Sequence, residues 1–477
     1  MPRRTKIIAT LGPATDDKST IESLIRAGID LVRINFSHGS LTDHQRRVNA
    51  VRECAASLGR AVGILGDLQG PKIRIGRFQN RCIHLEPGRK FVLDAGPAEF
   101  EGSLEAVGVD YKQLPADVNP GDFLLLDDGR IELQVDRIDD LRIICTVKTG
   151  GDLSDNKGIN RKGGGLSAGA LTAMDHEDLK AAAAMKVDYI AVSFVRHASD
   201  IRTTRKILNE LNTTAGIIAK IERSEAVKAV DEIIKASDGI MVARGDLGVE
   251  IGDAEVPAIQ KQIIERARAM DKPVITATQM MESMIQSPVP TRAEVSDVAN
   301  AVIDGTDAVM LSGETAVGRY PEKVIAAAER VCLAAERQPS TCISRHRVDC
   351  RFKWIDEAIS MSAMYAANHL NIKAIVALTE SGSTPLWMSR IRTATPIFGL
   401  SRYSDSLGKM TLYRNVYPLF FEVTRYQRDE IKREAITVLE RRGLLNTGDM
   451  AIITKGDQDG IYGVTNAMKI VEVGQVV

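Results

Sequence analysis

Several features typical of secreted, membrane-spanning and nucleic-acid-binding proteins are missing from this sequence of 477 residues. No run of about 18 apolar residues exists to cross a bilayer, and the apolar segment after the start is too short for a secretory signal. The six cysteines are scattered without a C-x-x-C pair, which disfavours a disulfide framework and a thiolate zinc site. We therefore expect a cytoplasmic protein with free thiols and no membrane partner.

Aromatic side chains and net charge are also scarce. Aromatic residues make up 4% of the chain and hydrophobic residues 44%, so aliphatic side chains must build the core. Lysine and arginine number 62 and acidic residues 63, which gives a net charge of -1. This balance argues against a general polyanion-binding surface, so nucleic acid is not expected as a partner.

Short segments rich in β-branched residues recur in the first two thirds of the chain. Alanine-, glutamate- and arginine-rich stretches with helical spacing separate most of them, for example at 19–27, 176–185 and 258–270. Repeated β-α units predict a parallel sheet. The eight segments start at Lys6, Leu31, Ala61, Tyr189, Gly216, Gly239, Pro273 and Ala308.

The spacing of these segments predicts three domains. The third and fourth starts lie 128 residues apart, whereas the other intervals are 23–35 residues, so something is inserted after the third strand. Without residues 69–164 and everything after 340, the remaining 244 residues approach the ~250 of a (β/α)8 barrel. We expect this TIM barrel to consist of residues 1–68 and 165–340.

The two other regions have different sequence patterns. Residues 69–164 alternate apolar and polar side chains with period two between Pro-Gly and Asp-Asp-Gly turns, which predicts a small antiparallel, β-barrel-like lid domain. The glycines at 163–165 are typical of its hinge. Residues 341–477 return to an α/β pattern, with helices at 355–370, 385–391 and 429–442, and predict a C-terminal open-sheet domain.

Polar side chains follow the carboxyl ends of several expected barrel strands. Arg33, Asn35 and Ser37 share one strand face, and a buried arginine there is costly without a partner. A salt bridge at the barrel rim is the alternative, but barrel enzymes keep their chemistry at this end. The same pattern recurs at Lys220, Glu222, Asp246, Thr278, Gln279, Ser312 and Glu314.

Two of these carboxylates, Glu222 and Asp246, are hard oxygen ligands suited to Mg²⁺ or Mn²⁺. Each also has a plainer interpretation, because Lys220 with Glu222 is a plausible internal ion pair and Asp246 can cap a turn. A divalent cation beside Lys220 and Arg33 suits a phosphoryl group or an enolate. No P-loop or G-x-G-x-x-G signature is present, so the residues alone point to phosphoryl or enolate chemistry.

Seven segments, in order, resemble the motifs of the pyruvate kinase family. With the barrel, the inserted lid and the C-terminal α/β domain, the resemblance covers essentially the whole chain. It implies transfer of a phosphoryl group from phosphoenolpyruvate to ADP, giving pyruvate and ATP in glycolysis. The segments are VRINFSHG, GDLQGPKIR, AKIERSEA, MVARGDLGVEI, TATQMMESM, PTRAEVSDVANAV and DAVMLSGETAVGRYP.

The resemblance also implies roles for the residues that match its motifs. Glu222 and Asp246 would hold the divalent metal, Lys220 would stabilise the transferring phosphoryl group, and Arg33 would bind the phosphate. Thr278 and the backbone of Ala243, Arg244 and Gly245 would seat the carboxylate and enolate end. Ser312 and Glu314 resemble residues of a proton relay, and the nucleotide side would be contacted by Asn35, His38, Arg74 and Lys157.

The potassium site of many family members is altered here. Its ligands match Asn35, Ser37, Asp67 and the residue that follows Asp67. This chain has Leu68 where the potassium-dependent pattern has threonine, and Lys72 where that pattern has glutamate. The resemblance therefore implies that Lys72 supplies the missing charge and that catalysis needs no potassium.

The C-terminal domain contains a loop with several hydroxyl groups before an expected helix. Thr379, Ser381, Gly382, Ser383 and Thr384 would form an anion pocket there, with Arg390 and Arg392 as possible assistants, or the loop is an ordinary helix cap. Family resemblance favours an allosteric pocket for a phosphorylated sugar or a nucleotide. The identity of the effector is not determined by the sequence.

Two other functions compete with this interpretation. A metal-dependent barrel aldolase or lyase acting on a pyruvate enolate uses similar groups but does not explain the lid or Lys220. A non-catalytic metabolite sensor is disfavoured, because it would not need the polar residues that are all present at the strand ends: Arg33, Lys220, Glu222, Asp246 and Thr278. The resemblance further implies a homotetramer, which no residue pattern here proves.

Overall fold

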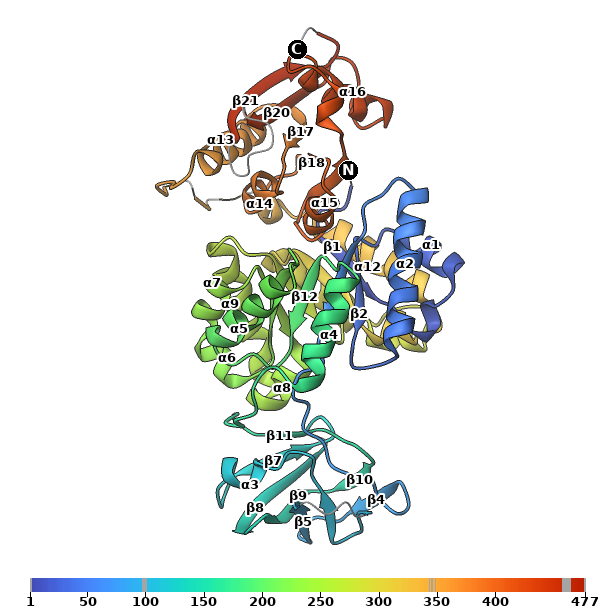
Figure 1. The fold of residues 1–477 in the computed structure, drawn as a ribbon, viewed down its shortest axis with the longest axis vertical. Coiled ribbons are helices and arrows are strands. Elements are labelled where there is room, and N and C mark those ends of the chain that lie inside the picture. Colours follow the sequence, from blue (N-terminus) through green and yellow to red (C-terminus); the bar gives the residue numbers. More distant parts are fainter. Residues whose placement is uncertain are drawn as a thin grey trace.

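The computed structural model describes residues 2–96, 101–342, 344, 346–347, 349–456 and 465–475. These residues form three regions in a row, with the inserted β domain at one end, the barrel in the middle and the C-terminal α/β domain at the other end (Figure 1). The outer limits of the expected first and third domains, at 1 and 476–477, lie outside the described residues.

All eight expected barrel strands are present and close into a parallel barrel. Around the barrel they follow the order β1-β16-β15-β14-β13-β12-β3-β2, so the insertion separates two neighbours, β3 and β12. The fold class expected from the strand spacing is confirmed. The strands are β1 (Lys6–Thr10), β2 (Leu31–Asn35), β3 (Gly63–Asp67), β12 (Tyr189–Val192), β13 (Gly216–Ile221), β14 (Gly239–Ala243), β15 (Val274–Ala277) and β16 (Ala308–Leu311).

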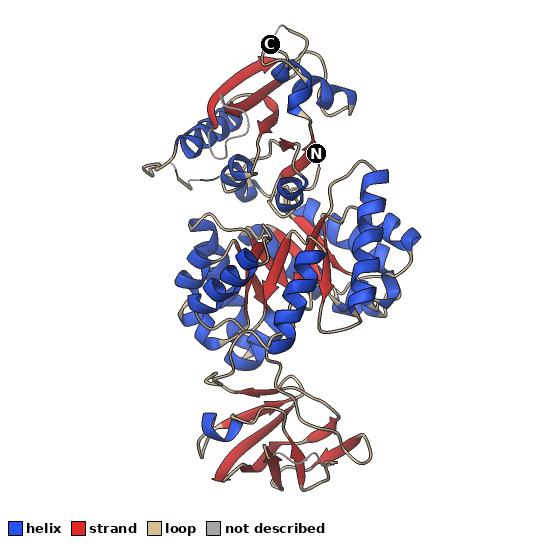
Figure 2. Cartoon of the chain, in the orientation of Figure 1, coloured by secondary structure: helices blue, strands red, loops and turns tan. Residues whose placement is uncertain are grey.

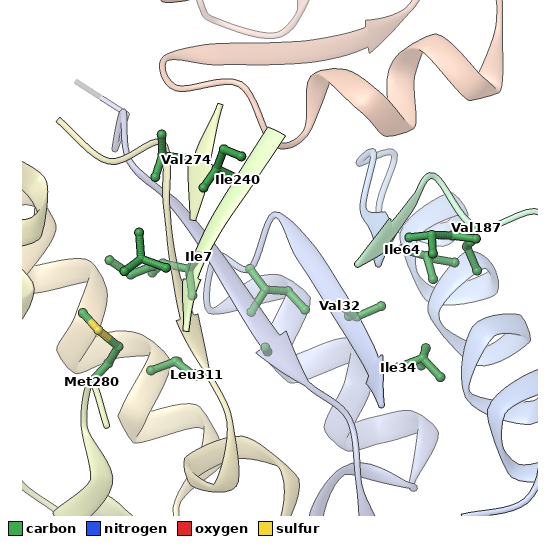
Figure 3. Close-up of a cluster of buried hydrophobic side chains, with 14 of the residues drawn as sticks. Ile7, Val32, Ile34, Ile64, Val187, Ile240, Val274, Met280 and Leu311 are labelled. Carbon is green, nitrogen blue, oxygen red and sulfur yellow. The ribbon is translucent and has the colours of Figure 1, made fainter. Parts of the chain in front are cut away.

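Helices surround these strands (Figure 2). Outward-facing strand residues such as Ile7, Val32 and Ile64 pack against them in one large apolar cluster (Figure 3). Amphipathic spacing therefore places the helices on the outside. They are α1 (Lys18–Arg26), α2 (Leu41–Ser57), α4 (Ala173–Ala184), α5 (Ala198–Glu210), α6 (Ser224–Lys228), α7 (Val230–Ala236), α8 (Arg244–Ile251), α9 (Val256–Ala269), α10 (Arg292–Asp304), α11 (Gly313–Ala316) and α12 (Pro321–Ala335).

Inward-facing residues change character along the same strands. Leu31, Leu65 and Ile218 belong to an apolar cluster at the amino end of the barrel. Two residues further along their strands, on the same face, come Arg33, Asp67 and Lys220. Strand alternation thus gives the barrel interior an apolar amino half and a charged carboxyl half.

The inserted domain is a small β structure, as expected. Its main sheet has the order β11-β7-β8-β9-β5-β6, is antiparallel except for the β5–β6 pair, and is accompanied by a β10–β4 ribbon. The elements are β4 (Cys82–Leu85), β5 (Lys90–Asp94), β6 (Ala106–Gly108), α3 (Leu114–Asp117), β7 (Phe123–Leu126), β8 (Ile131–Asp139), β9 (Arg142–Thr149), β10 (Gly151–Ser154) and β11 (Ile159–Arg161).

The C-terminal domain has a five-stranded sheet in the order β19-β18-β17-β20-β21, parallel except for β21. The sequence patterns missed α15 and β19, which are short and lack a strong period. The elements are α13 (Ile355–His369), β17 (Ile372–Leu378), α14 (Ser383–Ser389), β18 (Ile397–Ser401), α15 (Ser404–Met410), β19 (Val416–Phe420), α16 (Ile431–Arg441), β20 (Met450–Gly456) and β21 (Thr465–Glu472).

Short 3-10 turns complete the chain at 13–15, 253–255, 282–285, 339–341 and 423–425. Within the described ranges, none of the helices is both long and apolar enough to cross a membrane.

Candidate active site at the carboxyl end of the barrel

Four charged side chains from three strands meet inside the carboxyl end of the barrel. The Asp67 carboxylate lies between two cations, with Oδ2 2.6 Å from Arg33 Nε and Oδ1 3.3 Å from Lys220 Nζ. Lys220 Nζ also lies 2.8 Å from Glu222 Oε1. The internal Lys220–Glu222 ion pair considered from the sequence is therefore present, and it is part of a larger cluster.

Burial and mutual charge set the protonation of this cluster. Burial alone would lower the pKa of Lys220, but the carboxylates of Asp67 and Glu222 raise it, so the ammonium is held charged. Burial would raise the pKa of Asp67, whereas Lys220 and Arg33 lower it. Burial and the nearby charge of Asp246 raise the pKa of Glu222, with Lys220 opposing them. The cluster therefore keeps a charged ammonium inside the carboxyl end of the barrel.

Two residues that the sequence analysis missed orient this cluster. Ser193, just after β12, accepts a hydrogen bond from Lys220 Nζ at 2.7 Å and donates its own hydroxyl proton to the carbonyl of Leu68 at 2.7 Å. The backbone N–H of Phe194 donates to Glu222 Oε2 at 2.7 Å. Ser193 follows the end of β12, just as the predicted site residues follow the ends of other barrel strands. Its position after a strand is the sequence signal that points to it.

The carboxylate of Asp246 lies in the first turn of α8 and is half-buried. Among the described residues it has no ion-pair or hydrogen-bond partner, and its charge raises the pKa of Glu222. Two hard-oxygen carboxylates that repel each other, one of them unpaired, are a donor set that suits a divalent cation. No group of three or more His, Cys, Asp or Glu side chains suited to a metal occurs in the described part of the chain, so substrate and water would complete the coordination.

Thr278 and the start of α8 form a second polar feature. Gly245 N–H donates to Thr278 Oγ1 at 2.9 Å, and both Thr278 and Gln279 have left-handed backbones with φ of 66° and 53°. The side chain of Arg244 points elsewhere, to Asp297 at 2.6 Å and to the carbonyl of Thr278 at 2.6 Å. The Arg244 side chain thus contacts the Thr278 carbonyl, while its backbone lies at the start of α8.

The carboxylate of Glu314 supports two loops of the barrel rim. It is fully buried, with one oxygen accepting from Met281 N–H at 3.0 Å and the other from Ser312 N–H at 2.6 Å. Both oxygens are occupied by backbone, so this side chain positions the loops. The half-buried Ser312 lines the open space beside it.

A cleft of about 1230 Å³ separates the barrel end from the inserted domain. The inserted domain joins the barrel through Gly70, whose N–H donates to Asp175 Oδ1 at 3.0 Å, and through the glycines at 163–165, all with positive φ. The cleft is lined by barrel residues including Asp246, Thr278 and Ser312 and by Lys72, Leu125, Asp128 and Lys162 from the insertion.

The residues expected on the nucleotide side are only partly brought together. Partial burial and the positive charges of Arg74, Lys72 and Arg33 lower the pKa of His38, which places these groups near one another. Arg74 donates to the carbonyl of Asn156 at 2.8 Å. The ammonium of Lys157 pairs with Asp127 at 2.6 Å inside the inserted domain.

The positions that match a potassium site are occupied by other contacts. Asp67 is held by Arg33 and Lys220, and the Leu68 carbonyl accepts from Ser193. Asn35 Oδ1 accepts from Ser37 N–H at 3.2 Å. The Leu68 side chain is 2% exposed and packs in the outer apolar cluster.

In the C-terminal loop, the hydroxyl groups already have hydrogen-bond partners within the domain. Gly382 N–H donates to Thr379 Oγ1 at 2.9 Å, Ser381 and Ser383 share a 3.1 Å hydrogen bond, and the buried Thr384 hydroxyl bonds to Thr465 at 2.7 Å. The helix that follows, α14, has seven residues. The two arginines suggested as assistants, at 390 and 392, instead contact the barrel.

Comparison with known proteins decides the family. The model of the pyruvate kinase barrel domain matches residues 2–325, and that of the pyruvate kinase alpha/beta domain matches residues 357–471. The chain is 54% identical to pyruvate kinase II of Salmonella typhimurium over 99% of both chains. The chain belongs to the pyruvate kinase family. It is also 53% identical to the pyruvate kinase of Haemophilus influenzae over 96% of both chains, and 41% identical to pyruvate kinase 2 of Synechocystis over 98% of this chain and 79% of the relative.

Membership in the pyruvate kinase family establishes the reaction class. The enzyme is a phosphotransferase whose substrates are phosphoenolpyruvate and ADP and which requires a divalent metal. The family resemblance found in the sequence motifs is confirmed, as is the TIM barrel with its inserted and C-terminal domains.

Proposed function

We propose that the charged cluster inside the barrel end carries the phosphoryl-transfer step. The supporting observation is a connected set of ion pairs. Arg33 and Lys220 both pair with Asp67, and Lys220 also pairs with Glu222. Asp246 is nearby and has no ion-pair partner among the described residues. Phosphoryl transfer relies on positioning and charge neutralisation more than on covalent chemistry. Arg33 binds the phosphate, and Lys220 stabilises the phosphoryl group during transfer.

Glu222 and Asp246 would hold the divalent metal, which is Mg²⁺ or Mn²⁺. When bound, the metal neutralises charge on the substrate and helps to orient it. Glu222 is bonded to Lys220 at 2.8 Å in this structure. If Glu222 held a divalent cation, Lys220 would keep Ser193 and Asp67 as neighbours and would have an N–H available for the phosphoryl oxygens.

Thr278 and the backbone of Ala243, Arg244 and Gly245 bind the carboxylate and enolate end. Ala243, Arg244 and Gly245 lie at the start of α8, where backbone N–H groups favour anions. Thr278 follows β15 and is held against them by the hydrogen bond from Gly245 N–H. Ser312 lines the same cleft and is a member of the proton relay to the enolate. Glu314 acts through Ser312, because it holds that residue's backbone.

On the nucleotide side, Asn35, His38, Arg74 and Lys157 contact ADP when the inserted domain closes. The proximity of His38 and Arg74 supports this, whereas Lys157 must first leave Asp127. The glycine hinge at 163–165 permits the motion, and closure excludes water from the transfer. We place the domain limits at 1–68 with 165–340, 69–164 and 341–477.

One coupled assay tests the reaction against its rivals. Pyruvate must form from phosphoenolpyruvate only when both ADP and Mg²⁺ are present. Pyruvate release without ADP would indicate the lyase, and absence of turnover would indicate the sensor.

We further propose that catalysis needs no potassium. The two oxygens of Asp67 are engaged by Arg33 and Lys220, and Ser193 occupies the Leu68 carbonyl. Lys72 has no ion-pair partner within the described ranges and supplies positive charge near His38. Turnover in sodium- and potassium-free buffer should equal that with added potassium. A many-fold stimulation by potassium would contradict the proposal, and Lys72→Glu should create a potassium requirement.

The loop formed by Thr379, Ser381, Gly382, Ser383 and Thr384 is proposed to bind a phosphorylated sugar or nucleotide effector. Ser381 and Ser383 are half-buried and adjacent, which supports an oxyanion contact. The effector should lower the apparent KM for phosphoenolpyruvate, and Ser381→Ala with Ser383→Ala should weaken that response without changing the maximal rate. Unaltered activation in the double variant would exclude this loop.

Family membership also supports a homotetramer working in the cytoplasm, where its substrates are found. Light scattering of the purified enzyme measures the assembly, and cell fractionation followed by immunodetection measures the location. A dimeric or monomeric mass would contradict the first proposal.

A further inference from the structure

Ser224 and Glu250 join the two segments of the barrel that carry the proposed metal ligands. The backbone N–H of Ser224, two residues after Glu222, donates to Glu250 Oε2 at 2.8 Å. Glu250 itself lies four residues after Asp246 on α8. Both Ser224 and Glu250 are buried. One buried hydrogen bond therefore links the chain next to the first carboxylate with the helix that carries the second.

This bond also shows the direction in which α8 presents Asp246. Residues four apart on a helix lie on the same face. Because Glu250 reaches Ser224, the face of α8 that carries Asp246 is turned toward the end of β13, where Glu222 lies. The electrostatics agree, since burial and the charge of Asp246 raise the pKa of Glu222, with Lys220 opposing them.

The other side-chain contacts at the start of α8 are directed away from β13. Arg244 pairs with Asp297 of α10, and Gly245 N–H donates to the hydroxyl of Thr278 after β15. Strand pairing fixes β13 against β14, but it does not fix the tilt of the helix that follows β14. Within the described ranges, no other side-chain hydrogen bond or ion pair joins residues 222–225 to α8. The bond between Ser224 and Glu250 is therefore the side-chain contact that sets the separation of α8 from the end of β13.

A plainer role for Glu250 is to cap α6. Ser224 is the first residue of this helix, and the N–H groups at a helix start need acceptors. The usual acceptor is the side chain of the N-cap residue, but Arg223 at that position makes no such bond. The acceptor comes instead from α8, 26 residues away in the sequence. The cap is thus also a link between two segments of the site.

The return connection of the inserted domain holds the backbone of this pair in place. Gly163 N–H donates to the carbonyl of Glu250 at 3.0 Å, and the Ser224 hydroxyl donates to the Gly163 carbonyl at 2.7 Å. Neither bond uses the Glu250 carboxylate. A substitution at Glu250 therefore removes the link to the Ser224 N–H and leaves these two contacts available.

We propose that Glu250 is a positioning residue for the divalent metal. By holding the backbone of Ser224, it fixes the separation between Glu222 and Asp246 before the metal binds. Ligands that are already in position bind a metal more tightly than ligands that must first be ordered. This inference rests on the proposed metal site and adds to it a residue that does not touch the metal.

The test measures Mn²⁺ binding to the full-length enzyme without phosphoenolpyruvate or ADP, from the electron paramagnetic resonance signal of free Mn²⁺. Glu250→Ala should raise the Kd for Mn²⁺ about tenfold or more, as for the loss of other groups that orient metal ligands. Glu250→Gln keeps an oxygen acceptor for Ser224 N–H without the charge, so it should bind Mn²⁺ nearly as tightly as the wild type.

Two further variants control this comparison. Glu255→Ala removes an exposed carboxylate from the turn that follows α8 and should leave the Kd unchanged. Glu250→Asp keeps the charge but is one methylene shorter, so it should lose the contact with Ser224 and behave like Glu250→Ala. Circular dichroism checks that each variant is folded, and Glu250→Asp carries the test if Glu250→Ala does not fold.

Glu222→Gln separates this inference from the proposed metal site. It should weaken Mn²⁺ binding at least as much as Glu250→Ala. Unchanged binding in Glu222→Gln would overturn the metal site and the inference with it. Weaker binding in Glu222→Gln but wild-type binding in Glu250→Ala would overturn the inference alone.

Two other results would also overturn the positioning role. Equal losses of Mn²⁺ affinity in Glu250→Ala and Glu250→Gln would mean that the charge of Glu250 acts on the metal, and not its hydrogen bond. A lower urea midpoint in Glu250→Ala with an unchanged Kd would mean that Glu250 only caps α6.

Discussion

The two ends of the barrel meet their neighbouring domains in opposite ways. At the carboxyl end, an open cleft of about 1230 Å³ separates the barrel from the inserted domain, and glycines connect the two. At the amino end, barrel residues such as Ile8, Leu65 and Tyr189 share one apolar cluster with Met364, Ile375 and Met410 of the C-terminal domain. One junction leaves an open cleft, and the other is packed like the interior of a single domain.

Polar contacts follow the same division. At the amino end they are buried and cross the junction, as in the Arg390–Asp307 pair and the 2.7 Å hydrogen bond from the Tyr189 hydroxyl to the Lys409 carbonyl. At the carboxyl end the charged cluster belongs to the barrel itself, and contacts with the insertion occur at its two connections, as in the hydrogen bonds from Gly70 N–H to Asp175 and from Ser224 to the Gly163 carbonyl. The difference predicts that substitutions at the carboxyl end change the reaction, whereas those at the amino end change the stability of the domain pair.

The largest expected effect is at the carboxyl end. Lys220→Met removes the cation proposed to neutralise the transferring phosphoryl group, so kcat should fall by about 10⁴-fold, as for the loss of a comparable cationic finger. The coupled pyruvate assay measures this loss. Lys206→Met, an exposed lysine on α5, should retain wild-type turnover. Near-normal turnover in Lys220→Met would contradict the proposal that the carboxyl end of the barrel carries the reaction.

At the amino end, Asp307→Asn should weaken the junction without changing the KM for phosphoenolpyruvate. The change leaves the Arg390 charge buried without its partner, which costs about 3 kcal/mol. Both tryptophans, Trp354 and Trp387, lie in the C-terminal region, so fluorescence during urea unfolding reports on it. Asp231→Asn removes only an exposed pair with Arg266 and should shift the transition by less than ~0.5 kcal/mol.

Asp188 gives the amino end a pH dependence. Its carboxyl packs so closely against Gly408 of α15 that a Cβ there would lie 1.8 Å from it, and burial raises its pKa to about 7. Between about pH 4 and 7 the unfolded chain releases this proton while the folded protein retains it. The wild type should therefore lose roughly 2 kcal/mol of stability as the pH rises through this range, allowing for partial exposure.

Asp188→Asn checks this assignment. The variant keeps the acceptor for Ile64 N–H but cannot ionise, so the stability lost between pH 4 and pH 7 should be smaller than in the wild type by roughly 2 kcal/mol. Fluorescence-monitored urea unfolding at the two pH values measures it. An unchanged slope would assign the pH dependence to other groups.

The smallest expected effect is at Ser193. Ser193→Ala removes one of three acceptors around Lys220 and leaves the Leu68 carbonyl without its donor. A lost hydrogen bond to a charged group costs about 1.5 kcal/mol, so kcat should fall about tenfold while the KM for ADP is unchanged. Ser193→Thr retains the hydroxyl and should recover most of the activity. Equal losses in both variants would indicate a packing defect.

Local sequence patterns identified much of the barrel because each β-α unit combines a β-branched segment with an amphipathic helix. The polar residues at strand ends were identified for the same reason, since alternation fixes which side chains face inward. Ser193 was not predicted because a single uncharged hydroxyl after β12 is a weaker signal than the charged residues at the other strand ends. The α15 and β19 elements were missed because short segments have no clear period, and their structure depends on packing against the barrel.

The sequence by itself determined the order of the domains, the family and the identity of the residues at the strand ends. Only the tertiary structure showed that Asp67 lies between Arg33 and Lys220, that Lys157 pairs with Asp127, and that Arg390 and Arg392 face the barrel. The reason is that motif and period are local properties of the chain. Ion-pair partners come from residues far apart in sequence, and their distances and burial exist only after the strands have closed into a barrel.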